Sequence, residues 1–183
     1  MARITDYDFD LPAELVAQHP LENRSDARLM VIDRSSGRIE HQHVRDFAQF
    51  LQPEDCLVVN NSRVIPARLV GFRTRTQGRW EGLVLAVDPQ GSWQVMSKTR
   101  GRIDAGETVT LEGRDGRAGA RLRMMAPLGD GTWAARPEAD ENQEQILAAY
   151  GRVPIPPYIR GGEMMDRDVE DYQTIYASIE GSV

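Results

Sequence analysis

The chain has 183 residues, of which 40% are hydrophobic and 27% are charged, and its formal net charge is −6. This balance excludes a disordered tail, and no apolar run reaches the roughly 20 residues that a membrane-spanning helix needs. The single cysteine, Cys56, excludes an intramolecular disulfide and a cysteine-based zinc cluster, which favours a cytoplasmic protein without a membrane partner.

Charge is distributed unevenly along the chain. The net charge of −6 taken alone disfavours nucleic acid as a partner. Between Val70 and Pro137, however, eleven basic side chains stand against seven acidic ones, so this segment carries +4 and the remainder carries −10. Such a segment is typical either of a solvated surface or of one that contacts phosphate groups, and both interpretations stay open.

The part of the chain before Val70 mixes helix and strand signals. Pro20 ends the first predicted helix, because proline lacks an N–H and restricts the residue before it. The turn Ser35-Ser36-Gly37 joins two predicted strands as a hairpin, and a continuous apolar run from Cys56 predicts a buried strand. In chain order these elements are a helix over 11–18, strands over 28–33 and 38–41, an amphipathic helix over 44–51 and a strand over 56–59.

From Val70 the pattern changes to short strands separated by turns rich in glycine, proline and aspartate. Six strands at this spacing predict a small antiparallel β-barrel, closed or nearly closed. The predicted strands cover residues 69–74, 80–87, 92–97, 107–111, 120–125 and 132–135.

A helix is predicted after the last of these strands. Asp140 is the expected N-cap and Gln143, three residues on, completes a capping box. The helix should end at Tyr150, because Gly151 suits a C-cap and the prolines that follow cannot continue a helix.

An all-β insertion inside an α/β domain is the simplest topology that fits this order of elements. We therefore expect an α/β domain formed by residues 1–69 and 138–183, with an inserted small antiparallel β-barrel of about six strands at residues 70–137.

No standard catalytic motif is present: the chain has no glycine-rich phosphate loop, no GxSxG and no HExxH. His41 and His43 would share one face of a strand and form half of a metal site. No further histidine or cysteine lies nearby in the sequence to complete it, so we predict no metal.

The first candidate site is a polar stretch that follows the predicted buried strand. Ligands of α/β sheets bind at the carboxyl ends of strands, and the two arginines of this stretch could each clamp a carboxylate or phosphate. A polar turn that caps a helix is the alternative. The candidate residues are Asn60, Asn61, Ser62, Arg63 and Arg68.

Two further candidate stretches lie after the predicted barrel. Prolines stiffen residues 151–160, which would hold Tyr158 with little conformational entropy left to lose. In residues 168–177, helical spacing predicts Tyr172, Ile175 and Tyr176 as helical core. Gln173 and Thr174 would then point elsewhere, toward a ligand or toward water.

These stretches resemble the N-terminal half of the S-adenosylmethionine:tRNA ribosyltransferase-isomerase family of queuosine biosynthesis. The resemblance covers nearly the whole chain, and several ordered blocks make it specific. The similar blocks are residues 6–12, 20–24, 27–29, 60–69, 153–159, 172–177 and 181–183.

The resemblance implies a mixed α/β domain that carries an inserted β-barrel. It implies an enzyme that transfers and isomerises the ribosyl group of S-adenosylmethionine to 7-aminomethyl-7-deazaguanine in a tRNA anticodon. The products are epoxyqueuosine-tRNA, adenine and methionine. S-adenosylmethionine is consumed as a substrate, so no cofactor and no metal are implied, and the full-length family member is expected to be a monomer.

Roles for the candidate residues follow from this resemblance. Arg63 or Arg68 would hold the methionine carboxylate or a tRNA phosphate. Gln173 and Thr174 would bind a nucleobase edge, and Tyr158 or Tyr172 would stack on it. The catalytic base is not identified.

The chain departs from the family pattern in sequence and in length. Asn61 stands where the family usually has aspartate, Ser62 replaces threonine, and Asp171 stands where a basic residue is common. The family is about twice as long, so the α/β domain should be incomplete, and an exposed sheet edge predicts self-association. A truncated, non-catalytic tRNA-binding module is therefore the alternative function, and a small-barrel interaction protein is a third.

Overall fold

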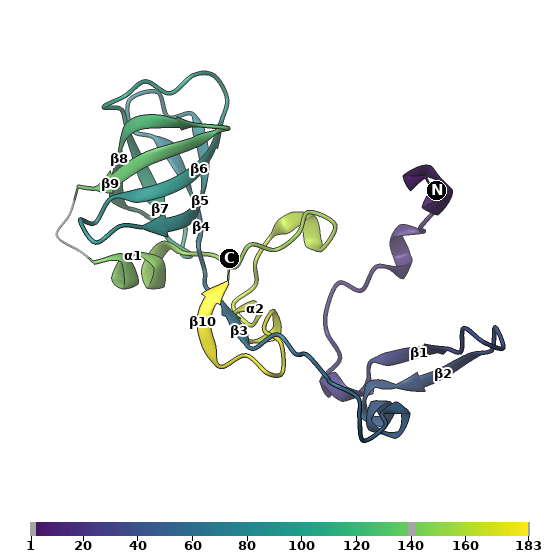
Figure 1. The fold of residues 1–183 in the computed structure, drawn as a ribbon. Coiled ribbons are helices and arrows are strands. Elements are labelled where there is room, and N and C mark those ends of the chain that lie inside the picture. Colours follow the sequence, from purple (N-terminus) through teal and green to yellow (C-terminus); the bar gives the residue numbers. More distant parts are fainter. Residues whose placement is uncertain (1–2, 139–141, 183) are drawn as a thin grey trace.

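The computed structural model describes residues 3–138 and 142–182. A β-barrel stands at one end of an elongated molecule, and the chain that precedes it extends away from the barrel (Figure 1). The predicted combination of mixed α/β structure with an inserted antiparallel barrel is confirmed. The structure outside the barrel consists of short helices and two two-stranded sheets.

Six antiparallel strands close the barrel in the order β4-β5-β6-β9-β8-β7. They overlap the six strands predicted from the sequence, which are confirmed. Their bounds are β4 (Arg68–Arg73), β5 (Arg79–Val87), β6 (Trp93–Thr99), β7 (Thr108–Glu112), β8 (Ala118–Gly129) and β9 (Thr132–Pro137).

Alternating burial explains why these segments form a barrel. Along β4 every second side chain is buried, because a strand in a closed sheet sends alternate residues to the inside. Gly71 allows β4 to close against β7, since a Cβ atom there would lie 2.1 Å from the carbonyl oxygen of Thr110. The buried side chains of the strands include Leu69, Trp80, Trp93, Val95, Val109, Leu111, Leu122 and Met124.

The helix α1 (Gln143–Tyr150) packs against one end of the barrel (Figure 1). Ile146 and Leu147 are buried in the same hydrophobic cluster as the barrel strands. The predicted end of this helix, with Gly151 as C-cap, is confirmed. The N-cap is Asn142, which forms a capping box with Gln145; the predicted cap, Asp140, lies outside the described residues.

One ion pair of the barrel is buried. The Arg73 guanidinium donates from Nε and Nη2 to the two carboxylate oxygens of Glu107, at 2.7 and 2.8 Å, and the side chains are only 10% and 7% exposed. The hydrogen bonds from Arg73 lower the pKa of Glu107, against the opposing effect of its burial. The pair therefore joins β4 to the loop before β7 by a charge-assisted, bidentate contact.

The predicted hairpin near the N-terminus is confirmed: β1 (Arg28–Ile32) pairs with β2 (Ile39–His43). The helices predicted over 11–18 and 44–51 form only as single 3₁₀ segments, which are shorter than predicted and wound more tightly than an α-helix. The 3₁₀ segments before the barrel are η1 (Ile4–Tyr7), η2 (Ala13–Leu15), η3 (Arg24–Asp26) and η4 (Val44–Phe50).

The buried strand predicted over residues 56–59 is wrong. These residues form no strand, and all four are exposed, Val58 by 87%. A continuous apolar run becomes a buried strand only when other elements cover it. Nothing in the described chain covers this run, so its hydrophobic side chains stay at the surface.

The chain after α1 forms η5 (Arg160–Gly162), α2 (Asp168–Asp171) and β10 (Ile179–Ser182), which pairs in parallel with β3 (Ser62–Val64). The predicted helical core at Tyr172, Ile175 and Tyr176 is wrong. The helix α2 ends at Asp171, and Ile175 and Tyr176 are exposed. The chain leaves the helix because residues 173–179 hydrogen-bond to the segment around β3 instead.

Candidate functional site

The structure brings two of the predicted stretches together. The Thr174 hydroxyl donates to the carbonyl oxygen of Asn60 at 2.9 Å, and the Gln173 side chain contacts Val64. The pairing of β3 with β10 continues this contact. The polar residues before the barrel and those near the C-terminal end of the chain, more than 100 positions apart, are therefore neighbours.

The side-chain amide of Gln173 bonds to the backbone of β3 as a peptide group of a neighbouring strand would. Its Oε1 accepts from the Val64 N–H at 2.8 Å, and its Nε2 donates to the carbonyl oxygens of Val64 at 3.1 Å and Val169 at 2.9 Å. Both amide hydrogens are used by these bonds, so only one acceptor lone pair is left. This geometry favours a positioning role for Gln173 over the predicted contact with a nucleobase.

We expect Gln173→Ala to release residues 172–179 from β3. Two backbone groups of Val64 would lose their partners, at a cost of about 1–3 kcal/mol. The measurement is hydrogen exchange at the amides of Val64, Ser178 and Ile179, which should become faster. Gln94→Ala, at an exposed position of β6, is the control, and equal acceleration in both variants would contradict the assignment.

The polar stretch before the barrel is a turn that leads into a strand, so the helix-capping alternative is wrong. Asn60 Oδ1 accepts from the Ser62 N–H at 2.9 Å, and the Asn61 carbonyl accepts from two backbone amides beside β10. Ser62 is half-buried at the start of β3, and Arg63 on the same strand is exposed.

The two candidate tyrosines lie in different surroundings. Tyr158 is 66% exposed, whereas Tyr172 is half-buried. Burial raises the pKa of Tyr172, and the electrostatic effect of Tyr158 raises it further. Tyr158 is exposed, and its stacking on a nucleobase stays a prediction.

Arg68 lies in a cleft between the barrel and residues 152–164, which we call the strap. The strap is tied to β4 by a pair of backbone hydrogen bonds between Arg68 and Arg152. Arg68 Nη1 donates to the carbonyl oxygen of Gly162 at 2.7 Å, and its Nη2 donates to Glu81 Oε2 at 3.1 Å. The prolines of the strap thus form one wall of a cleft whose other wall is the barrel.

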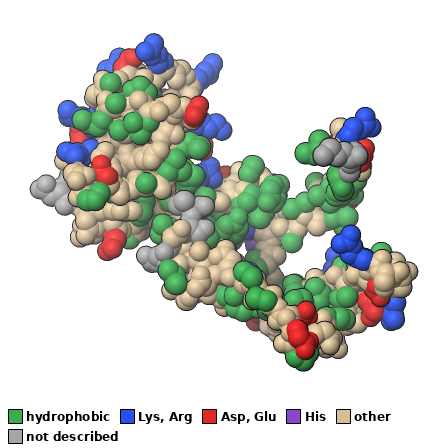
Figure 2. Space-filling view, in the orientation of Figure 1, with side chains coloured by type: hydrophobic (Ala, Val, Ile, Leu, Met, Phe, Trp, Pro, Cys, Tyr) green, Lys and Arg blue, Asp and Glu red, His purple; other side chains and the backbone are tan. Residues whose placement is uncertain are grey.

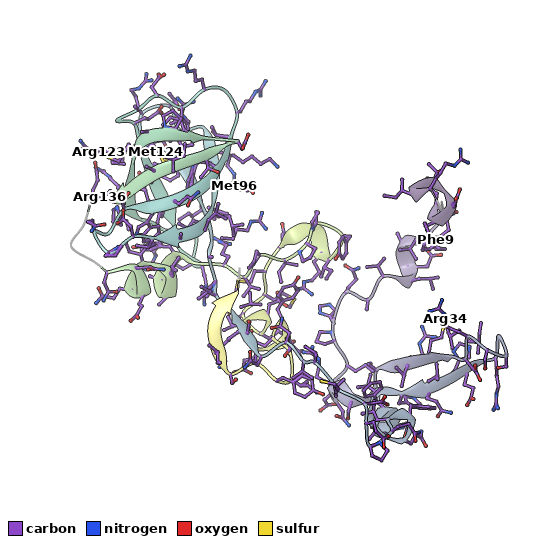
Figure 3. All side chains as sticks on the ribbon, in the orientation of Figure 1. Phe9, Arg34, Met96, Arg123, Met124 and Arg136 are labelled. Carbon is purple, nitrogen blue, oxygen red and sulfur yellow. The ribbon has the colours of Figure 1, made fainter. Side chains whose placement is uncertain are left out.

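The cleft contains two adjoining hollows that share Arg68 and Glu81. The first has a volume of about 330 Å³ and mostly apolar walls, and Lys98 is among the residues that line it. Met96, labelled in Figure 3, belongs to this hollow on β6. Its apolar side chains are Leu83, Met96, Pro154, Ile155 and Pro157.

The second hollow, of about 360 Å³, is rich in charges. Arg152 lines it, and its Nε, which is buried, has no acceptor among the described residues. A buried N–H without a protein partner is normally satisfied by water or a ligand. The charged side chains around this hollow are Arg68, Arg79, Arg152, Glu81, Glu112 and Glu163.

A buried network holds the far end of the strap. Arg160 Nη2 donates to Asp168 Oδ2 at 2.5 Å, and the two side chains are 16% and 5% exposed. The Arg160 N–H donates to Gln18 Oε1 at 2.8 Å, and Met165 N–H donates to the same Asp168 oxygen at 2.6 Å. The network keeps Arg160 in the left-handed region, at φ 47°, which a non-glycine residue rarely adopts.

Several residues of the cleft were missed from the sequence. Glu81 and Lys98 come from β5 and β6, and no motif marks them. Asp168 and Gln18 support the strap from the two ends of the chain. The run Gly161-Gly162, where both residues have positive φ, was the one local signal for a sharp turn against Arg68.

The surface of the barrel is basic. Of the eleven basic residues between Val70 and Pro137, ten are exposed and only Arg73 is buried. Blue side chains lie at several places on the face of the barrel that Figure 2 shows. Arg123 and Arg136, labelled in Figure 3, are direct cross-strand neighbours on β8 and β9, and Glu138 accepts from Arg123 at 2.7 Å.

Within residues 3–138 and 142–182, no three histidine, cysteine or acidic side chains lie close enough together to hold a metal ion. In the same residues, no helix combines the length and the hydrophobicity that crossing a membrane requires.

Comparisons with known proteins identify the family. The family model described as "Queuosine biosynthesis protein" matches residues 4–183. The S-adenosylmethionine:tRNA ribosyltransferase-isomerase of Desulfitobacterium hafniense is 41% identical over 180 residues, which are 98% of this chain and 51% of the relative. The proteins of the same name from Clostridium kluyveri and Clostridioides difficile are 38% and 40% identical, and the chain covers 50% of each.

A crystal structure of S-adenosylmethionine tRNA ribosyltransferase from Thermotoga maritima is 30% identical in sequence. Its superposition covers 79% of this chain and 48% of that chain, with a TM-score of 0.37. The chain therefore spans about half the length of the curated relatives it matches. Because the family model matches residues 4–183, the chain belongs to the queuosine biosynthesis protein family.

Proposed function

We propose that this chain contributes the N-terminal half of an S-adenosylmethionine:tRNA ribosyltransferase-isomerase. The observation that carries the proposal is identity of about 40% to relatives of that name over nearly the whole chain. The proposed reaction moves the ribosyl group of S-adenosylmethionine to 7-aminomethyl-7-deazaguanine in a tRNA anticodon and isomerises it. The products are epoxyqueuosine-tRNA, adenine and methionine. We further propose a cytoplasmic, monomeric full-length form without a resident cofactor or metal.

The cleft suits the methionyl end of S-adenosylmethionine. An α-amino acid head group carries a carboxylate and an ammonium, so it needs a cation and an anion close together. Arg68 and Glu81 supply this pair at 3.1 Å, and the guanidinium can bind a carboxylate through two parallel N–H groups. The apolar walls formed by Met96 and Ile155 would pack against the carbon and sulfur atoms of the substrate.

The chemistry requires more groups than this cleft supplies. A base must remove the proton beside the positively charged sulfonium, and a donor must assist the departure of adenine. Attack by the aminomethyl nitrogen and loss of methionine would follow. We assign Arg68 and Glu81 to binding and assign no residue of this chain as the base.

The basic barrel surface suits the tRNA. Its exposed arginines would neutralise backbone phosphates, which give sequence-independent affinity and a strong dependence on salt. The exposed ring of Tyr158 would stack on an unpaired base of the anticodon loop. The net charge of −6 does not oppose this role, because the acidic excess lies outside the barrel segment.

Adenine release tests the proposed activity. The chain would be combined with the second half of the D. hafniense relative, with S-adenosylmethionine and with tRNA that carries 7-aminomethyl-7-deazaguanine. We expect adenine, methionine and epoxyqueuosine-tRNA in equal amounts, and none with tRNA that carries guanine at that position. If adenine is absent although the two halves bind each other, the proposed activity is wrong.

The second candidate function is a non-catalytic tRNA-binding module. It is favoured by one observation: the barrel is closed and has its own core, whereas no residue from 3 to 66 is buried. Binding of tRNA that weakens steeply with salt, without any release of adenine, would support this module over the enzyme.

We expect Arg68→Ala to weaken S-adenosylmethionine binding by about 10- to 100-fold, because one charge-assisted contact is lost. Isothermal titration calorimetry of the two-half complex measures the affinity, and Arg68→Lys should recover part of it. Arg34→Ala, at the exposed hairpin turn that Figure 3 shows far from the barrel, is the matched control. Equal affinities for the Arg68→Ala and Arg34→Ala variants would remove Arg68 from the binding site.

A further inference from the structure

The second hollow of the cleft, of about 360 Å³, contains charged groups that no protein partner engages. Within residues 3–138 and 142–182, the carboxylate of Glu163 forms no ion pair and accepts no hydrogen bond. Glu112 approaches Arg152 Nη2 only to 4.0 Å, which is beyond hydrogen-bond distance. Among the same residues, the exposed Arg79 has no acid within 4.0 Å and the buried Nε of Arg152 has no acceptor. Two carboxylates and two guanidinium groups therefore have hydrogen-bonding capacity left for a ligand.

The charges of this hollow determine which kind of ligand fits it. Three arginines and three glutamates line the hollow, so their formal charges cancel. A phosphate offers only acceptors and would face the carboxylates, whereas a simple cation offers only donors and would face the guanidinium groups. A nucleobase carries donors and acceptors side by side on one edge, so it satisfies both kinds of group.

The two hollows of the cleft adjoin one another, because four residues line both: Arg68, Glu81, Gly161 and Gly162. The proposed reaction joins a ribosyl donor to an amine acceptor, and such a reaction is fast only when both substrates are held in contact. The first hollow has mostly apolar walls and contains the Arg68–Glu81 pair, so it suits S-adenosylmethionine. The second hollow is left for the acceptor.

We propose that the second hollow binds the target base, 7-aminomethyl-7-deazaguanine, when that base turns out of the anticodon loop. The guanine edge presents neighbouring N–H groups that one carboxylate can accept, and an O6 atom that accepts from a guanidinium. The aminomethyl group is a primary amine, protonated at neutral pH as a lysine is, so it needs a second carboxylate. Bases of the anticodon loop are unpaired, which lowers the cost of turning one out. The proposal rests on the proposed function, because only that reaction requires this second substrate.

The positions of the two carboxylates assign their roles. Glu112 lies beside Arg152, and together they offer the acceptor and the donors that the guanine edge needs. Glu163 directly follows Gly161 and Gly162, which also line the first hollow. The aminomethyl nitrogen must lie close to the ribosyl donor in the first hollow. We therefore assign the guanine edge to Glu112 and the aminomethyl group to Glu163.

The barrel provides cations next to the hollow for the RNA backbone. The Thr99 hydroxyl donates to the carbonyl oxygen of Arg79 at 2.7 Å, which places Arg100 beside Arg79. In the described part of the chain, Arg75, Lys98 and Arg100 are exposed and have no acid within 4.0 Å. These side chains would neutralise the phosphates that flank the extruded base.

Methyl NMR separates the two hollows, because a different methionine lines each. Met164 lines the second hollow, where its Sδ accepts from the Val153 N–H at 3.0 Å. Met96, labelled in Figure 3, lines the first hollow. The chain would carry methionine labelled with carbon-13 at the methyl group, and Met96→Leu and Met164→Leu assign the two signals. We expect 7-aminomethyl-7-deazaguanine to shift the Met164 signal, and S-adenosylmethionine to shift Met96 more than Met164.

Conservative substitutions test the two carboxylates through the affinity that this titration gives. Glu112→Gln should weaken binding of 7-aminomethyl-7-deazaguanine and of 7-deazaguanine equally, by about 10-fold, since both present the same guanine edge. Glu163→Gln should weaken only the aminomethyl base, so the preference for it over 7-deazaguanine should disappear. Glu144→Gln, at an exposed position of α1 outside the hollow, is the control.

Tryptophan fluorescence verifies that each variant retains a folded barrel, because every tryptophan lies in a barrel strand. These residues are Trp80, Trp93 and Trp133.

Four results would overturn the proposal. The first is a base that leaves the Met164 signal unchanged, and the second is a Met164 shift produced by inorganic phosphate or mainly by S-adenosylmethionine. The third is equal weakening by Glu144→Gln and Glu163→Gln. The fourth is a Glu163→Gln variant that still prefers the aminomethyl base.

Adenine release by the two-half complex distinguishes failure of this proposal from failure of the proposed function. If adenine is released but Glu112→Gln and Glu163→Gln bind the base as Glu144→Gln does, the second hollow is not the base site and the proposed activity stands. If the base binds as expected but no adenine is released, the base site stands and the proposed activity is wrong.

Discussion

Replacing Glu107 by alanine is expected to lower the free energy of unfolding of the barrel by about 3–5 kcal/mol, because Arg73 would remain buried without a counter-charge. Urea unfolding followed by tryptophan fluorescence measures this change, and all three tryptophans report on the barrel. Glu138→Ala removes the partner of the more exposed Arg123 and should cost no more than about 1 kcal/mol. Equal losses in the two variants would show that the Arg73–Glu107 pair gains nothing from its burial.

The same pair makes barrel stability depend on pH in a defined direction. Hydrogen bonds from Arg73 lower the pKa of Glu107 below its ordinary value of 4.5. The folded state then binds a proton less readily than the unfolded state. The stabilisation is therefore fully present above pH 4.5 and is lost as the pH falls through the lower, folded-state pKa.

Urea midpoints measured between roughly pH 6 and pH 2 should thus fall with acid. Glu107→Gln should be less stable at neutral pH and should have a flatter acid profile. The pKa of Glu138 is lowered in the same direction by Arg123, so a double variant should be flatter still. An unchanged acid profile in Glu107→Gln would contradict the assignment.

Replacing Asp168 by asparagine is expected to make the strap, residues 152–164, open locally more often. The substitution leaves the Arg160 guanidinium largely buried without a counter-charge, at a cost of about 3 kcal/mol, or about a 100-fold increase in local opening. Hydrogen exchange at Gly162, Met165 and Tyr172 is the measurement, because these amides are bonded within the strap and α2. The proposed binding of S-adenosylmethionine should weaken with it, since Gly162 accepts a hydrogen bond from Arg68 in the cleft.

Asp171→Asn is the control for this substitution. Asp171 also lies in α2 and pairs with an arginine, but that partner, Arg167, is exposed. An exposed pair of this kind contributes about 0.3–0.5 kcal/mol, so exchange in the strap should change little. Comparable acceleration in both variants would mean that the charge of Asp168 has no special role in holding the strap.

Local patterns were sufficient to predict the barrel. Alternating side chains and turn residues are read within a few positions of one another, and four of the six strand pairs of the barrel join strands that are consecutive in the sequence. The hairpin β1-β2 was predictable for the same reason. The apolar run at residues 56–59 was not, because burial depends on what covers a strand, and nothing in the described chain does so.

For the candidate site, the sequence predicted several of the residues that take part but not which of them are in contact. The sequence by itself determined the barrel, the hairpin, the basic surface and the polar stretches that carry the family resemblance, because each of these follows from local pattern or residue content. Only the tertiary structure decided that Arg68 meets Glu81 and Gly162, and that Gln173 bonds to Val64, 109 positions away. Such contacts depend on how the barrel closes and where the strap returns, and these are long-range pairings that no local pattern specifies.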